Sequence, residues 1–158
     1  MIKIKEKLLT ETAAKAKDAE RKRCNYNFHK DPADPINRML NAMRRGAYFP
    51  PHKHEDPDKR EIFIILKGRV LIAEFNENGR VTDHITLDPE KGNMGVEIPP
   101  KVWHTLVPLA ENSVLYEIKD GPYNKDIDKT FPEWAPKEGE EGIQEFVDRI
   151  LKEVGGVL

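Results

Sequence analysis

The chain has 158 residues, of which 38% are hydrophobic and 34% are charged. This length and composition predict one folded domain with a charged surface, and they exclude a disordered chain. The 28 acidic residues slightly outnumber the 26 basic ones, for a net charge of −2. No basic stripe therefore points to a nucleic-acid partner.

Membrane and secretory signals are absent from the pattern. The longest apolar run, Ile62–Leu66, is far shorter than the roughly 20 residues that a membrane-spanning helix needs. The start of the chain is too charged for the apolar segment of a signal peptide. Cys24 is the single cysteine and cannot form an intrachain disulfide. We therefore expect a cytoplasmic protein without a membrane partner, stabilised by packing or by a metal.

Residues 1–36 form the first of three predicted regions. Ile2 and Ile4 alternate with lysines, which indicates a short strand. From about Lys5 to Glu20 the segment is rich in Ala, Lys and Glu, which are strong helix formers. We predict a helix here, outside the main core, followed by a polar arm that extends to residue 36.

Residues 37–120 form the second region, in which short apolar runs alternate with turn residues. One strand begins near Arg38, and the later predicted strands cover residues 61–66, 69–75, 80–87, 96–98, 103–107 and 113–119. Several short strands at this spacing are typical of a β-sandwich or β-barrel. The sequence thus predicts a mainly β protein.

Residues 121–158 form the third region. The segment 121–136 contains prolines and no periodicity, so we expect an irregular arm that lies over the barrel or across a partner. After Gly142 the apolar residues follow helical spacing until Gly155–Gly156, which would end the helix. The residues of this stripe are Ile143, Phe146, Val147, Ile150, Leu151 and Val154. We expect this helix and the Ile2/Ile4 strand to build a homodimer.

Three histidines in the second region stand at the spacing of metal ligands. His52 and His54 are two positions apart, so on a strand both side chains lie on one face. Glu61 opens the next predicted strand, which could return beside them, and His104 lies on a later strand. Three imidazoles and a carboxylate suit Fe, Mn, Ni, Co or Zn and are too rich in nitrogen for Mg or Ca.

We therefore predict that His52, His54, Glu61 and His104 hold one divalent transition-metal ion. One alternative is that His52 and His54 face solvent and bind no metal. Another is that Glu61 is a surface acid at the start of its strand and is not a metal ligand. The acids that could replace it are Glu55, Asp56 and Asp58.

These residues also carry a family resemblance. The pattern Gly46-x5-His52-x-His54-x6-Glu61-x6-Gly68 resembles the first cupin motif, and Pro99-x-Lys101-x2-His104 resembles the second. The resemblance implies a single cupin barrel, a double-stranded β-helix or jelly roll, with a helix at each end of the chain. Three features depart from the family: the gap before Glu61 is longer than usual, Lys101 replaces a glycine, and Pro108 stands where an asparagine is common.

A narrower resemblance extends over nearly the whole chain, to the WbuC-type cupin metalloproteins. The matching segments are Asn25–His29, Pro50–His54, Val96–Pro99, Val102–His104 and Lys119–Tyr123. This resemblance implies a metal site, a small-molecule ligand and a setting in surface-polysaccharide synthesis. It does not supply a substrate.

Further candidates for ligand binding surround the predicted metal site. In an extended segment Asn25, Asn27 and His29 would point the same way and contact a substrate, with His29 as general acid or base; otherwise His29 is an ordinary loop residue. Arg38 would either pair with an acid at the rim or bind an anionic ligand. Asn41, Tyr48 and Glu117 could orient the metal ligands through hydrogen bonds.

Several functions are compatible with such a site. One is a metal-assisted isomerase or epimerase that acts on a small polar molecule, such as a sugar or a sugar-derived acid. An Fe(II) dioxygenase is a second possible enzyme with the same metal site. The alternatives outside catalysis are a ligand-binding or sensory module without turnover, and a purely structural metal.

Overall fold

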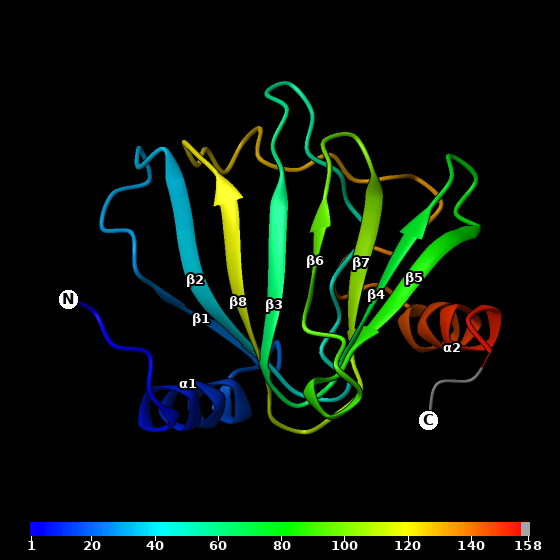
Figure 1. Ribbon diagram of the computed structural model, residues 1–158. Helices are drawn as coiled ribbons and strands as arrows, with labels where there is room; N and C mark the ends of the chain where they lie inside the picture. Colours follow the sequence, from blue (N-terminus) through cyan, green and yellow to red (C-terminus); the bar gives the residue numbers. More distant parts are fainter. Residues whose placement is uncertain (156–158) are drawn as a thin grey trace.

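The structure is a computed structural model that describes residues 1–155. In this range two antiparallel β-sheets face each other, and one helix covers the outside of each sheet (Figure 1). The elements in chain order are α1 (Glu6–Asp18), β1 (Arg23–Asn27), β2 (Ile36–Met43), β3 (Glu61–Lys67), β4 (Val70–Phe75), β5 (Val81–Leu87), a 3₁₀ turn (Pro89–Lys91), β6 (Gly95–Ile98), β7 (Trp103–Pro108), β8 (Ser113–Asp120) and α2 (Ile143–Glu153).

The first sheet has the strand order β1-β2-β8-β3-β6, and the second has the order β5-β4-β7. The late strand β8 lies between β2 and β3 and pairs antiparallel with both. The loop between β2 and β3 joins the two sheets, because the backbone of His52 pairs with that of His104 on β7. This arrangement confirms the predicted mainly β jelly-roll barrel.

Alternating side chains on each strand separate the barrel interior from the outer layers, as the pleat requires. On β4, Val70 and Ile72 face the interior, and Leu71 and Ala73 face outward under α2. The inward side chains of the two sheets pack against one another in the barrel interior, as in the close-packed core of other proteins. The buried interior cluster consists of Met43, Ala47, Phe49, Phe63, Ile65, Val70, Ile72, Leu87, Ile98, Leu106 and Leu115.

Helix α2 packs on the outside of its own barrel. Its buried residues Phe146 and Ile150 contact the outer side chains of β4 and β7, including Trp103. The predicted apolar stripe is therefore covered within one chain, and Gly156 of the predicted helix stop lies outside the described residues. Helix α1 covers the first sheet in the same way. Among the described residues, no helix has the length and apolar character of a membrane span.

Three parts of the chain differ from the sequence expectation. Arg23–Asn27 forms the edge strand β1, which completes the backbone hydrogen bonds of β2; its Asn-rich sequence has low β-propensity, so the pattern did not indicate it. Ile2 and Ile4 precede α1 without forming a strand. Strand β3 does not return beside His52 and His54, because β8 and β6 occupy its two edges.

The barrel interior has two ends of opposite character. The inward side chains of β3 are Glu61, Phe63 and Ile65 in order along the strand, and β8 runs antiparallel beside it. The register places Ile65 opposite Leu115 and Glu61 opposite Lys119. We call the first end the apolar floor and the second the polar mouth.

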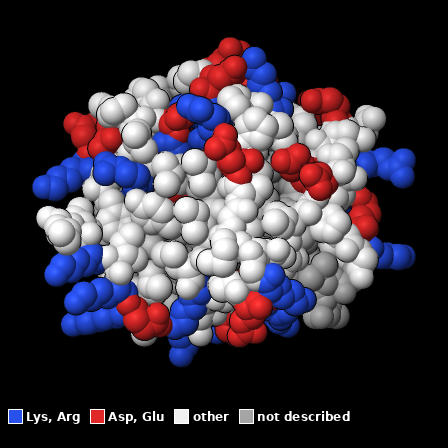
Figure 2. All heavy atoms as spheres, viewed as in Figure 1, with Lys and Arg blue, Asp and Glu red and all other residues white. Residues whose placement is uncertain are grey.

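The outer face of the first sheet is mostly uncharged. In the view of Figure 2, most Lys, Arg, Asp and Glu lie toward the edge of the molecule, acidic groups also lie in the upper middle, and uncharged residues fill the centre. Ile64 of β3 points to this outer face and is exposed. Tyr26 of β1 and Ile36 of β2 are exposed apolar side chains of the same sheet.

Candidate metal centre

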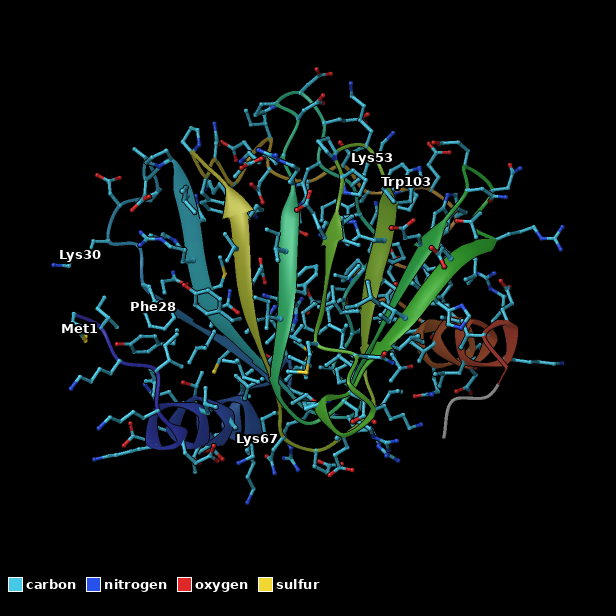
Figure 3. All side chains as sticks on the ribbon, in the orientation of Figure 1. Met1, Phe28, Lys30, Lys53, Lys67 and Trp103 are labelled. Carbon is cyan, nitrogen blue, oxygen red and sulfur yellow. The ribbon has the colours of Figure 1, made fainter. Side chains whose placement is uncertain are left out.

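The loop that carries His52 and His54 directs both imidazoles into the barrel. Between them, Lys53 points outward, and its Nζ lies 4.5 Å from the centre of the Trp103 ring (Figure 3). The backbones of His52 and His104 exchange two hydrogen bonds of 3.0 and 2.9 Å. Because Trp103 and Lys53 share the outer face, His104 and its two loop partners share the inner one.

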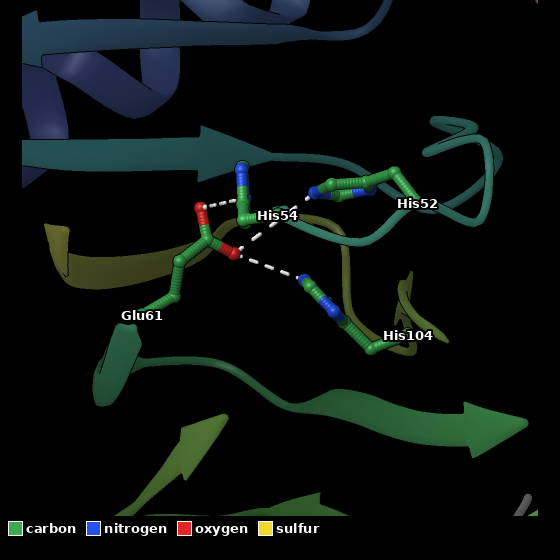
Figure 4. Close-up of side chains that lie close together, drawn as sticks. All are labelled: His52, His54, Glu61 and His104. Carbon is green, nitrogen blue, oxygen red and sulfur yellow. Dashed lines mark hydrogen bonds and ion pairs between the residues drawn. The ribbon is translucent and has the colours of Figure 1, made fainter. Parts of the chain in front are cut away.

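Glu61 is the first residue of β3, and its carboxylate lies among the three imidazoles (Figure 4). Its oxygens are 2.9 Å from His104 Nε2, 3.0 Å from His54 Nε2 and 3.9 Å from His52 Nε2. All four side chains are buried, and one ligand atom from each lies within 4.8 Å of every other. The structure thus brings the four predicted side chains to one point at the polar mouth.

The hydrogen bonds of the three rings fix which nitrogen faces the carboxylate. Each Nδ1 contacts a backbone carbonyl oxygen: His52 that of Pro50 (3.0 Å), His104 that of Val102 (2.9 Å) and His54 that of Asp128. A carbonyl oxygen only accepts, so each Nδ1 carries the proton, and in a neutral ring Nε2 then presents a lone pair. All three lone pairs face a carboxylate, which also only accepts.

This arrangement fits a bound cation. Nε2 of His52 and Nε2 of His54 are buried without a hydrogen-bond partner. Burial, followed by the positive charge of Lys129, lowers the pKa of His52, so this ring stays neutral. For Glu61, burial acts to raise the pKa, but the adjacent His104 and His54 rings hold it well below the usual range. Three imidazole nitrogens and one ionised carboxylate are a donor set for a divalent transition metal.

The acids considered in place of Glu61 lie at the surface. Glu55 pairs with Lys53 at 3.0 Å, Asp58 pairs with Lys101 at 3.1 Å, and Asp56 is exposed in the same turn. None of the three belongs to the buried cluster. The longer gap before Glu61 accommodates this turn.

Asp128 of the irregular arm contacts the metal-ligand cluster through both its backbone and its side chain. Its backbone oxygen accepts the hydrogen bond from His54 Nδ1. Its carboxylate binds the buried ammonium groups of Lys59 (2.8 Å) and Lys119 (2.6 Å). Lys119 Nζ is also 3.8 Å from the Glu61 carboxylate. A hydrogen bond to the second nitrogen of a ligand histidine orients the ring and tunes its basicity.

A cavity of about 500 Å³ opens beside the cluster at the polar mouth. Asn25, Asn27 and His29 line it, together with Asn41 and Glu117. Asn41 Nδ2 donates to Glu117 Oε2 at 2.9 Å. Burial and then the nearby Glu61 charge raise the pKa of Glu117. A cavity of this size accommodates a small organic molecule.

His29 and Arg38 are placed differently from each other. The His29 ring is anchored at Nδ1, which lies 3.0 Å from both the backbone nitrogen and the backbone oxygen of Arg38. Its Nε2 is therefore the nitrogen available to a ligand. The Arg38 side chain is outside the cavity and forms a 2.6 Å ion pair with Asp34. This ion pair corresponds to the rim pairing, one of the two alternatives for Arg38.

Other residues of the site were not indicated by the sequence. Lys59, Asp128 and Lys129 stand in irregular segments whose pattern carries no period that would mark them. Tyr48, considered as a partner of the ligands, instead donates its hydroxyl to the Pro136 carbonyl oxygen at 2.7 Å under α2.

Fold and site together define the class of this protein: it is a cupin-fold protein with a buried three-histidine, one-glutamate cluster. Comparison with solved structures supports the fold. The capsular polysaccharide assembling protein CapF from Staphylococcus aureus superposes with a TM-score of 0.57 and 20% identity, over 70% of this chain and 32% of that one. The present chain thus spans about a third of the length of CapF.

Two further structures share the fold. A recombinant oxalate oxidase in complex with glycolate has a TM-score of 0.54 and 14% identity, over 72% of this chain and 56% of that one. KdgF from Halomonas sp. has a TM-score of 0.50 and 20% identity, over 65% of this chain and 80% of that one.

The family is shown by a sequence profile rather than by these structures. The profile of a domain of unknown function, DUF6016, matches residues 4–87, which is just over half of the chain. The chain belongs to this family. A search of the curated proteins finds no significant match.

Proposed function

We propose that this protein is a metal-dependent cupin that acts on a small polar metabolite, a sugar or a sugar-derived acid, by isomerisation or epimerisation. His52, His54, Glu61 and His104 would hold one divalent ion of Fe, Mn, Ni, Co or Zn. The observation that carries this proposal is the meeting of three Nε2 lone pairs with one carboxylate in a buried cluster. Four acceptors without a cation would repel one another.

The open cavity beside the cluster favours a ligand-binding role over a purely structural metal. A structural metal site is usually closed by its protein ligands. When bound, the ion would polarise a carbonyl or hydroxyl oxygen of the ligand and lower its proton affinity. Asn25 and Asn27 would bind polar groups of that ligand from the cavity wall.

His29 is the proposed acid–base residue. Isomerisation or epimerisation removes a proton from a carbon atom and returns one, which requires a positioned group that exchanges protons near neutral pH. The anchored Nδ1 of His29 leaves Nε2 for this exchange, and the ring lines the cavity. Arg38 is not part of the proposed site.

The biological setting belongs to the same proposal. The resemblance to WbuC-type cupins supports a role in surface-polysaccharide synthesis, and CapF is described as a capsular polysaccharide assembling protein.

A homodimer is proposed as well, supported by the exposed Ile2 and by the uncharged outer face of the first sheet with Ile64. Light scattering of the purified chain would give its mass, and a monomer would contradict the dimer.

The test of the function combines metal analysis with solvent exchange. We expect the purified protein to contain one transition-metal ion per chain. Incubated in D₂O with small aldoses, ketoses and their acids, the loaded protein should introduce deuterium at a substrate carbon. His29→Ala should keep the metal and lose the exchange. Full metal content without exchange on any substrate would contradict the enzymatic function and favour a binding module.

A further inference from the structure

Lys129 is held beside the metal cluster by the residues on both sides of it. On one side, the Asp128 carbonyl oxygen binds His54 Nδ1. On the other side, the Thr130 backbone exchanges hydrogen bonds of 3.1 and 3.0 Å with Lys53. The arm therefore has a fixed position over the loop of the metal ligands, and the Lys129 side chain lines the cavity.

The ammonium group of Lys129 has no protein partner in residues 1–155. Lys59 and Lys119 both bind the Asp128 carboxylate, whereas the Lys129 side chain, which lines the cavity, forms no hydrogen bond or ion pair among the described residues. The charges that act on it are those of the barrel interior, chiefly Glu61, Lys119 and Glu117. Lys129 is exposed by surface area, and desolvation at the cavity wall, the largest cause, lowers the pKa of its ammonium group.

Two more polar atoms on the same cavity lack partners. The Arg23 guanidinium lies over the Phe49 ring at 4.4 Å and binds Glu138 through one terminal nitrogen, but its Nε is buried without an acceptor. Asn41 Nδ2 donates to Glu117, and its Oδ1 is buried without a donor. A buried polar atom without a partner costs free energy, so each of these atoms is expected to meet a ligand or water.

The charge of the cavity wall also favours an anion. Five basic side chains line the cavity against four acidic ones, and a divalent ion on the cluster would add to the positive side. Of the acids, Glu61 belongs to the metal cluster, Glu138 is bound by Arg21 and Arg23, and Asp128 is bound by two lysines. Three of the four acids are thus engaged locally, and the fourth, Glu117, accepts a hydrogen bond from Asn41. Lys129 forms no ion pair among the described residues.

We propose that Lys129, together with Arg23 Nε, forms an anion-recognition subsite beside the metal cluster, and that the cavity takes a carboxylate-bearing polyol rather than a neutral sugar. The ligand carboxylate accepts from the Lys129 ammonium, and a hydroxyl group donates to Asn41 Oδ1. This inference deepens the proposed function and rests on it for the metal-bound end of the ligand. A charge-assisted hydrogen bond is about twice as strong as a neutral one, so the carboxylate is the main determinant of selectivity.

The test compares D-gluconate with D-glucitol, which share a polyol chain and differ in the carboxylate. Binding of each to the Mn²⁺-loaded full-length protein is measured by calorimetry, and manganese content is measured on the same samples. We expect gluconate to bind about tenfold tighter or more, the order of one charge-assisted hydrogen bond. Lys129→Met should abolish this preference, and Lys129→Arg should retain most of it.

The matched control is Lys91→Met, which removes an exposed lysine on the 3₁₀ turn, away from the cavity. It should bind gluconate as the parent does. Equal binding of the two polyols, no binding of gluconate, or an undiminished preference in Lys129→Met would overturn the subsite. Gluconate selectivity that depends on Lys129 in a protein that takes up no manganese would instead retain the subsite and contradict the metal centre.

Discussion

At the apolar floor of the barrel, β3 and β8 meet through Ile65 and Leu115, and at the polar mouth the same two strands meet through Glu61 and Lys119. Both ends are buried, but they differ in what burial does to stability. Apolar side chains stabilise the fold by about 1.5–3 kcal/mol each when removed from water. Buried ions lose hydration, and their mutual attraction often only offsets that cost.

The difference between the two ends separates folding from function. The floor alone has the composition of an ordinary core, and the two outer helices add apolar layers to it. The mouth contains Glu61, Lys119, Lys59 and Asp128, all less than 5% exposed. An apolar residue of similar size at these positions would commonly be as stable or more stable. Their charges are therefore explained by binding rather than by folding.

Glu61→Gln should weaken metal binding at the polar mouth without changing the packing at the apolar floor. The substitution removes the only anionic member of the cluster and keeps its shape, so metal affinity should fall by more than the roughly 10–100-fold that follows the loss of a supporting partner. Circular dichroism should show an unchanged fold. A variant that still holds one tightly bound ion per chain would show that the carboxylate is not a ligand.

Asp128→Asn should affect both stability and the metal. Removing one partner from a buried ion pair typically destabilises by about 3–5 kcal/mol, and here two buried lysines lose their counter-ion. These ion pairs hold the arm whose Asp128 backbone oxygen orients His54, so metal affinity should also fall, by up to roughly 10–100-fold. Urea unfolding and metal titration measure the two effects, with the exposed Asp126→Asn as control.

Leu115→Ala should lower the stability of the fold through the apolar floor and leave metal binding at the polar mouth nearly unchanged. A cavity at a fully buried leucine costs about 2–5 kcal/mol, which urea unfolding would report. Below the unfolding transition the variant should still bind one ion per chain with nearly unchanged affinity. A large loss of metal affinity would show that the two ends are more strongly coupled than the packing indicates.

The pH dependence of stability should carry the signature of Asp128. Burial acts to raise the pKa of this carboxyl, but Lys119 and Lys59 hold it below its ordinary value of 3.8. A carboxyl with a lowered pKa stabilises the fold fully above its unfolded-state pKa and loses that contribution as the pH falls toward the folded-state pKa. Below about pH 4 the parent should thus lose stability more steeply than Asp128→Asn. Parallel slopes would contradict the pairing.

Lys101→Gly should increase the stability of the protein slightly. Lys101 has a φ of 68° at the position where the cupin motif has glycine. The left-handed conformation costs a non-glycine residue about 1–2 kcal/mol, and the greater freedom of glycine when unfolded offsets part of the gain. We expect a net increase in stability of about 0.5–1 kcal/mol in thermal unfolding. A decrease would indicate that the Asp58 ion pair outweighs the strain.

The sequence predicted the features that depend on local pattern. Alternation and turn residues located β3, β4, β5 and β7, and the spacing of His52 and His54 indicated a shared ligand point. The features that it missed depend on the path of the chain in space. Asp128 meets His54 across 74 positions, and no local period records that contact. Strand β1 was missed because its pairing with β2, not its Asn-rich sequence, makes it a strand.

The central claim is that a metal ion lies where the three imidazoles meet Glu61. Anomalous diffraction from crystals of the purified protein, collected on both sides of the absorption edge of its metal, tests this most directly. We predict one peak per chain within bonding distance of Nε2 of His52, His54 and His104 and of the Glu61 carboxylate. An ordered cluster with no peak, or an ion bound only elsewhere, would contradict the account.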